Sequence, residues 1–134
     1  MPKSLIKLNL GESFNQPITA GIFPPSLIYL KFGRAFNQSL EEGVLPQNLI
    51  ILKFGSSFCH KLKFNVLPIS LKILSFGYSF NQPFDVGVLP DSLIKITFGV
   101  CFNQPLTIQN SIDDTITSIL PKFLQHLSFG WYFN

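Results

Sequence analysis

Apolar residues along this chain follow a three-position pattern that returns every 22 residues. Each copy reads L-x-x-L-x-F and ends in an apolar, polar, apolar alternation, which is typical of a short half-buried strand. The five intact copies are Leu5/Leu8/Leu10, Leu27/Leu30/Phe32, Leu49/Leu52/Phe54, Leu71/Leu74/Phe76 and Leu93/Ile96/Phe98. The pattern therefore predicts one short strand in each copy.

A glycine, a second phenylalanine and a proline complete each copy. The glycine directly follows the predicted strand and suits a turn that needs a positive φ. The proline cannot sit in a central strand, so it marks the approach to each new one. The second phenylalanine is predicted to point inside and to pack on its copies above and below. These stacked phenylalanines are Phe14, Phe36, Phe58, Phe80 and Phe102.

Six units make up a single repeat domain over residues 1–134, starting near residues 2, 24, 46, 68, 90 and 121. The sixth is offset by 31 residues instead of 22, which places nine additional residues within 107–119. A unit of this size cannot bury its own apolar face, but stacked neighbours can. We predict a repeat solenoid, a leucine-rich-repeat-like β-solenoid with a parallel sheet, a largely irregular convex side and little helix.

The complete motif resembles the FNIP repeat, a Phe-Asn-x-Pro variant of the leucine-rich repeat. Four copies carry the resemblance, "LGESFNQPI", "FGRAFNQSL", "FGYSFNQPF" and "FGVCFNQPL", and it covers essentially the whole chain. FNIP repeats are of the kind found in amoebae and their giant viruses, where they often follow an F-box or a related adaptor segment. The resemblance implies a protein-interaction scaffold. Recruitment of substrates or adaptors to host ubiquitination is the alternative that it suggests.

Strand residues that point away from the core form two columns on the predicted concave face. One column is Lys7, Tyr29, Ile51, Ile73, Lys95 and His126, and the other is Asn9, Lys31, Lys53, Ser75, Thr97 and Ser128. Most acidic residues fall in the return loops instead, so this face is expected to be basic. The predicted partner-binding residues, including two on one rim, are Tyr29, Lys31, Arg34, Ile51, Lys53, Ile73, Ser75, Tyr78, Lys95 and Thr97.

Three interpretations of this face are open. In the first, the lysines keep the sheet soluble and discourage edge pairing. In the second, the face binds an acidic or mixed surface of a protein partner, with Tyr29, Ile51 and Ile73 as anchors. The third, nucleic acid, is disfavoured because the lysines are few and Tyr29 is the one aromatic stacking partner.

The asparagine after each second phenylalanine is expected to stack in register with its copies. In solenoids such side chains turn inward and bond to backbone groups, although display for a ligand is an alternative. The glutamines that follow are expected to stay in solvent. In the third unit "FCHK" replaces "FNQP", so Cys59 interrupts the ladder and makes that turn a weak rung. The predicted ladder consists of Asn15, Asn37, Asn81 and Asn103.

The segment 107–119 contains a polar, turn-prone "NSIDD" and a β-branched "TITSI" that could form a small extra strand. Insertions in repeat proteins map to loops. A tolerated bulge and a partner contact are both consistent with it.

Candidate catalytic groups are few. Each histidine and each cysteine lies at its own repeat position, too far apart for a metal site or an unstrained disulfide. They are His60, His126, Cys59 and Cys101. No nucleophile-elbow, phosphate-loop or zinc-protease motif occurs. The sequence predicts no enzyme, no cofactor and no metal site.

Composition and the ends of the solenoid indicate the expected partners and location. The charge of +3 is too small to indicate a nucleic-acid or membrane partner. No apolar run of membrane-spanning length occurs, and two cysteines without a disulfide pattern favour a reducing, cytoplasmic location. The resemblance to FNIP repeats of giant viruses extends this expectation to the host cytosol. Uncapped solenoid ends predict self-association, unless Trp131, Tyr132 and Phe133 form an aromatic lid.

Overall fold

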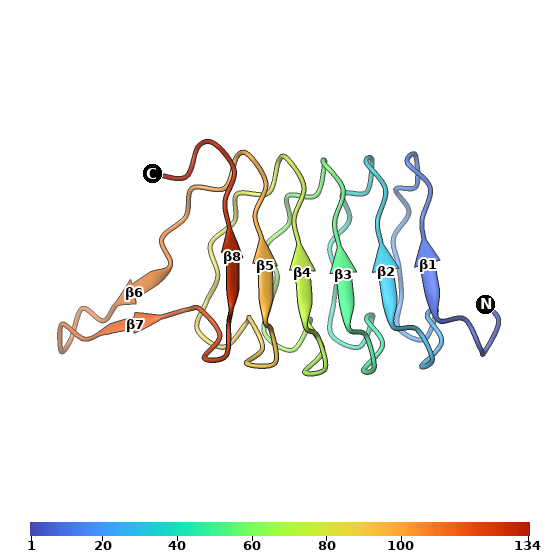
Figure 1. The fold of residues 1–134 in the computed structure, drawn as a ribbon, viewed down its shortest axis with the longest axis horizontal. Coiled ribbons are helices and arrows are strands. Elements are labelled where there is room, and N and C mark those ends of the chain that lie inside the picture. The colour runs from blue at the N-terminus through green and yellow to red at the C-terminus, as the bar shows by residue number, and fades with distance from the viewer.

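The computed structural model describes residues 1–134 as a stack of coils with strands and no helix (Figure 1). The parallel sheet has six strands in the order β1-β2-β3-β4-β5-β8. Their bounds are β1 Lys7–Asn9, β2 Tyr29–Lys31, β3 Ile51–Lys53, β4 Ile73–Ser75, β5 Lys95–Thr97 and β8 His126–Ser128. The predicted parallel β-solenoid is confirmed. None of its segments is a helix of the length and hydrophobicity that crossing a membrane requires.

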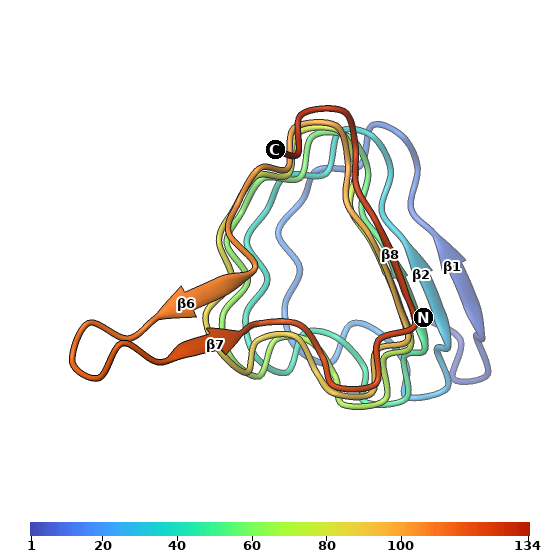
Figure 2. The ribbon, with the colours of Figure 1, turned by 60° about the vertical axis from the view of Figure 1, so that its left-hand side comes forward.

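The additional segment between the fifth and sixth coils is a hairpin. Its strands, β6 Thr107–Gln109 and β7 Ile116–Ser118, pair antiparallel. Viewed obliquely from one end of the stack, each coil has three sides, one of which is the sheet, and the hairpin projects away from the coils (Figure 2). The predicted strand in "TITSI" is β7, and β6 is a partner that the sequence pattern did not indicate.

Neighbouring strands pair in register, so equivalent residues of successive coils lie side by side. Leu30 pairs with Leu52 and Leu52 with Leu74, and all three side chains are completely buried. The flanking residues of each strand point to the other face. The alternation read from the sequence thus separates a buried row from two outward-facing columns.

Two phenylalanine columns run through the core. Within the third coil, the ring centroids of Phe54 and Phe58 lie 3.9 Å apart. Between coils, Phe54 lies 5.4 Å from Phe76, and Phe58 lies 6.0 Å from Phe80, with nearly parallel ring planes. Stacked aromatic pairs add about 0.5 to 1.5 kcal/mol each beyond the burial of their area. The columns therefore tie each coil to both of its neighbours.

The glycine after each strand serves close packing, and the prediction that it needs a positive φ is wrong. A Cβ on Gly55 would collide with the carbonyl group of Gly33, and one on Gly77 would collide with that of Gly55. The coils therefore stack backbone against backbone where no side chain fits. Positive φ values of 62° to 82° occur instead at one position of the return path, occupied by Gly21, Gly43, Asn65 and Gly87.

The aromatic residues after β8 do not form a lid. Trp131 is 93% exposed and Tyr132 62% exposed, and both occupy the corner that follows the strand glycine. Phe133 instead continues the phenylalanine column, 6.1 Å from Phe102. The lid interpretation is therefore wrong for Trp131 and Tyr132.

Candidate partner-binding face

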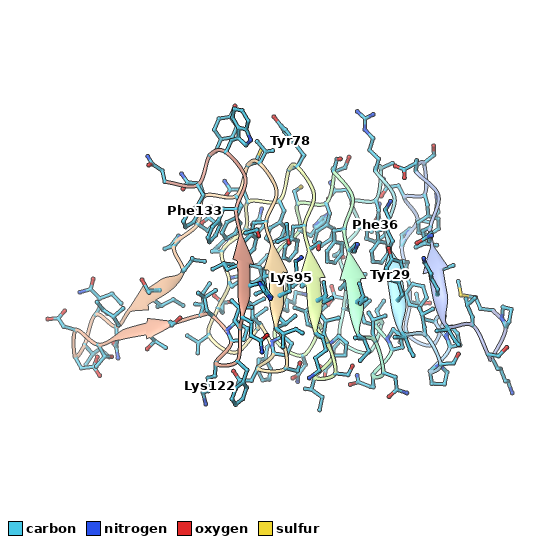
Figure 3. The ribbon with its side chains drawn as sticks, viewed as in Figure 1. Tyr29, Phe36, Tyr78, Lys95, Lys122 and Phe133 are labelled. Atoms are coloured by element: carbon cyan, nitrogen blue, oxygen red, sulfur yellow. The ribbon has the colours of Figure 1, made fainter.

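The outward residues of β1 to β5 and β8 form one continuous surface, which we call the sheet face. Its first column follows the pairing of Lys7 with Tyr29, Tyr29 with Ile51, Ile51 with Ile73 and Ile73 with Lys95. Its second column contains Lys31, Lys53, Ser75 and Thr97. Figure 3 shows Tyr29 and Lys95 over the sheet. The structure therefore brings together eight of the ten residues predicted to bind a partner.

The sheet face combines an apolar centre with exposed cations. Ile51 and Ile73 are half-buried neighbours in the middle of the sheet. Lys31 and Lys95 are exposed on either side of this pair. A partner that covered the pair would remove apolar area from water, which is the favourable term in most protein associations.

Tyr29 is held by two lysines of neighbouring strands. The ammonium of Lys7 lies 4.8 Å from the centroid of the Tyr29 ring, and that of Lys53 lies 5.8 Å from it. The negative face of an aromatic ring attracts such cations. These contacts order the lysine side chains over the ring, but they do not neutralise the charges.

The salt bridges lie away from the sheet face. They join Lys61 with Asp85, Lys63 with Glu41, and Lys122 with Asp91. The four lysines of the sheet face take part in none of them. These unpaired lysines are Lys7, Lys31, Lys53 and Lys95. Three of the seven acidic residues thus compensate loop lysines, and the sheet face keeps a positive charge.

Arg34 and Tyr78, the other two predicted residues, do not belong to the sheet face. They lie at the corner after the strand glycine, where they line a polar pocket of about 380 Å³ with Ser56, Ser57 and Ser79. Tyr78 stands at the crest of this corner in Figure 3. The pocket is polar because its side chains carry a guanidinium and four hydroxyl groups.

The asparagine ladder lies at the surface, although the sequence predicted inward-pointing side chains. The backbone N–H of Asn37 donates to Oδ1 of Asn15 at 2.9 Å, and that of Asn103 donates to Oδ1 of Asn81 at 2.8 Å. Asn15, Asn81 and Asn103 are exposed, and Asn37 is half-buried. Each side chain therefore joins its own coil to the next one, at the rim of the stack.

Two of the four glutamines, Gln38 and Gln104, take part in this ladder, and the expectation that they stay in solvent is wrong for these two. Nε2 of Gln38 donates to Oδ1 of Asn15, and Nε2 of Gln104 donates to Oδ1 of Asn81, each at 3.0 Å. A shared asparagine oxygen thus receives both a backbone and a side-chain donor. The regular "NQ" spacing was the signal for this pairing.

The third coil keeps part of the ladder and lacks one rung. The backbone N–H of Cys59 donates to Oδ1 of Asn37 at 3.1 Å, and Nε2 of His60 lies 3.0 Å from the carbonyl oxygen of Asn37. His60 thus takes over a contact of the glutamine. Cys59 offers no side-chain oxygen, and the backbone N–H of Asn81 makes no hydrogen bond within the protein.

A second ladder was not recognised in the sequence, although the L-P-x-S motif contains its residues. Ser70 Oγ donates to the carbonyl oxygen of Leu49 at 2.7 Å, and Ser92 Oγ donates to that of Leu71 at the same distance. Each of these serines lies just before a strand and bonds to the preceding coil. The serines therefore satisfy backbone carbonyls at the opposite end of the sheet from the asparagines.

The β6–β7 hairpin is closed by hydrogen bonds of its own tip. The hydroxyl of Thr115 donates to Oδ1 of Asp113 at 2.7 Å, and the backbone N–H of Thr115 donates to the same oxygen at 3.0 Å. These bonds favour the ionised carboxylate and lower the pKa of Asp113 from its ordinary 3.8. Three apolar side chains, Ile108, Ile112 and Ile116, are exposed along the hairpin.

The side chains with potential for chemistry stay apart. Cys59 and Cys101 are both free thiols. No three histidine, cysteine, aspartate or glutamate side chains come together as metal ligands would. The sheet face and the corner pocket are therefore the candidate binding features of the surface.

Comparison with known proteins places these features in a family. Three consecutive segments, residues 1–35, 36–79 and 80–119, match the family described as FNIP Repeat. Among solved structures, the crystal structure of CroV588, described as a novel circular LRR protein structure, is 48% identical with a TM-score of 0.91. That match covers 100% of this chain and 18% of the CroV588 chain. No curated protein matches the sequence significantly.

Proposed function

Because this chain belongs to the FNIP-repeat family, whose scaffolds generally mediate protein interactions and are typically non-enzymatic, we propose that it is a non-enzymatic scaffold that binds a protein partner through its sheet face. One observation carries the proposal. Four lysines without acidic partners surround the half-buried pair Ile51 and Ile73, while the lysines of the three salt bridges lie elsewhere.

The chemistry of the face indicates the kind of partner. An acidic or mixed protein surface would pair with the lysines and cover the two isoleucines. Apolar contact at the centre supplies affinity, and charge complementarity at the margin raises the association rate and fixes the orientation. A partner of this kind would associate more slowly as salt is added, because exposed charges are screened over roughly 8 Å at physiological ionic strength.

The position of the lysines argues against a purely protective role. Lysines that discourage edge-to-edge pairing are needed on the outermost strands of a sheet. Here Lys31 and Lys53 lie on β2 and β3, which are paired on both sides. Protection of an edge does not account for charges at the centre of the sheet.

The test is an affinity capture from amoebal extract with the whole chain as bait. The variant Tyr29→Ala/Ile51→Ser/Lys53→Glu removes the anchors and reverses one charge of the sheet face. The control Lys3→Glu/Ile69→Ser makes similar changes at exposed residues outside the face. We expect proteins captured by the wild type and the control to be lost from the triple variant. Capture of the same proteins by all three forms would exclude the sheet face as the binding surface.

A further inference from the structure

At the corner after β1, a carboxylate of one coil caps a backbone N–H of the next. Oε2 of Glu12 accepts the hydrogen bond of the Arg34 backbone N–H at 3.0 Å. Glu12 and Arg34 hold the same position in successive units, directly after the strand glycine. A hydrogen bond to an ionised acceptor is stronger than one between neutral groups. This corner therefore shows which chemical group fits between two coils.

The next corner repeats the backbone arrangement without the carboxylate. The Ala35 N–H donates to the carbonyl oxygen of Glu12 at 2.8 Å, and the Ser57 N–H donates in the same way to that of Arg34 at 3.0 Å. Ser56 now stands where Arg34 stood. Its backbone N–H makes no hydrogen bond within the protein, because Arg34 has replaced the glutamate and carries only donors.

Ser56 is part of the corner pocket of about 380 Å³ described above. The residues that line it are Arg34, Ser56, Ser57, Tyr78 and Ser79, which carry one guanidinium, four hydroxyl groups and no carboxylate. Arg34 forms no salt bridge with any carboxylate of the chain. The residues that line this pocket thus carry an unpaired cation, several hydroxyl groups and a free backbone N–H, all of which can donate hydrogen bonds to an anion.

We propose that this corner pocket binds a carboxylate, with the guanidinium of Arg34 and the backbone N–H of Ser56 as its principal donors. A guanidinium matches the two oxygens of a carboxylate, and Glu12 shows that a carboxylate reaches the equivalent N–H one coil earlier. The source of the carboxylate is an acidic side chain of a protein partner. This last step rests on the proposed protein-binding function, whereas the pocket itself does not.

The first test uses acetate as a probe of the carboxylate alone. Acetate is titrated into the ¹⁵N-labelled chain at constant ionic strength, and the amide signals are followed by NMR. We expect the Ser56 amide signal to shift in a saturable way with acetate. The acetate affinity taken from this shift should be at least about tenfold weaker in Arg34→Gln. The control Lys95→Gln, which removes a cation of the sheet face, should leave the acetate affinity at Ser56 unchanged.

Two outcomes of this titration would overturn the proposal. Shifts that do not saturate, or that persist in Arg34→Gln, would show general attraction of anions to a basic chain. A parallel titration with inorganic phosphate distinguishes the other common oxyanion. Tighter binding of phosphate than of acetate would overturn the carboxylate assignment.

The second test builds the carboxylate into the chain. Arg34→Glu places a glutamate one coil after Glu12, where its carboxylate would accept from the Ser56 N–H. We expect hydrogen exchange of this amide to slow by about tenfold and the response to acetate to disappear. The complementary Glu12→Gln variant should speed exchange of the Arg34 amide. Unchanged exchange of the Ser56 amide in Arg34→Glu would show that the two corners are not equivalent.

The two proposals fail in different ways. If acetate does not bind but the sheet-face variant still loses its captured proteins, only the corner site is wrong. If acetate binds with the predicted dependence on Arg34 but the sheet-face variant captures the same proteins, the sheet face is wrong and the corner site stands.

Discussion

The strands of the sheet and the strands of the hairpin have the same length but different surroundings. The central residue of β3, Leu52, is completely buried between the coils on either side. In β6 and β7 all three residues are exposed. Since both kinds of strand are hydrogen-bonded to a neighbour, pairing is common to them and apolar burial is not. Stacking of coils therefore stabilises the body of the molecule, and local bonds shape the hairpin.

Removing one ring from a phenylalanine column should cause the largest loss of stability among these predictions. Phe58→Ala leaves a cavity beside the rings of Phe54 and Phe80, and we expect the free energy of unfolding to fall by about 3 to 5 kcal/mol. Ile112→Ala in the hairpin, where the side chain is 93% exposed, should change it by less than about 0.5 kcal/mol. Denaturant unfolding of both variants is the measurement. Similar losses in the two variants would contradict the contrast between the stacked coils and the hairpin.

Close stacking of the coils predicts the second-largest loss of stability. In Gly55→Ala the new methyl group collides with the backbone of Gly33, so two coils must separate, and we expect a loss of about 1 to 3 kcal/mol. Gly11→Ala is the matched control, because a Cβ there meets nothing within 4 Å. Thermal unfolding distinguishes the two. Equal tolerance of both alanines would refute the argument from close packing.

Repairing the asparagine ladder should stabilise the third coil. Cys59→Asn supplies the missing acceptor for the Asn81 backbone N–H, and we expect a gain of about 0.5 to 1.5 kcal/mol. Cys59→Ala, which removes the thiol without adding an acceptor, controls for the loss of sulfur. A melting temperature of Cys59→Asn at or below that of the wild type would show that this rung contributes nothing.

The effect of acid on the hairpin tip should be the smallest of these effects. The pKa of Asp113 is lowered in the folded state by its hydrogen bonds from Thr115, so the ionised form is favoured there. The contribution of this carboxylate is therefore present above its ordinary pKa of 3.8 and is lost as the pH falls through the lower folded value. The Thr115 amide signal in NMR should follow this titration, and Asp113→Asn should abolish it. A transition above pH 3.8 would reverse the predicted sign.

Much of the fold could be predicted because the repeat is almost invariant. The observed strand Ile51–Lys53 lies inside the predicted segment between Leu49 and Phe54, and the other sheet strands follow the same rule. In-register stacking of equivalent residues then places the sheet-face columns. Less could be predicted for the hairpin, because β7 had a β-branched signal whereas its partner β6 had no pattern of its own.

The candidate site was predicted in part, and the wrong predictions share one cause. Arg34 and Tyr78 were grouped with the sheet face, but the turn after the glycine directs them into a separate pocket. The glutamines were assigned to solvent, although Gln38 reaches the asparagine of the preceding coil. In both cases the residue type predicts a role within its own unit, while the contact that decides this role comes from another coil.

The amino-acid sequence by itself determined the period, the strand positions and the residues that share a column, because identical units can bury their apolar faces only by stacking in register. Only the tertiary structure decided how closely the coils approach. That distance excludes a side chain at Gly55, joins Asn37 to Asn15, and leaves the Ser56 N–H free beside Arg34. Such contacts depend on separations of a few ångströms between coils, which a repeat pattern along the chain does not specify.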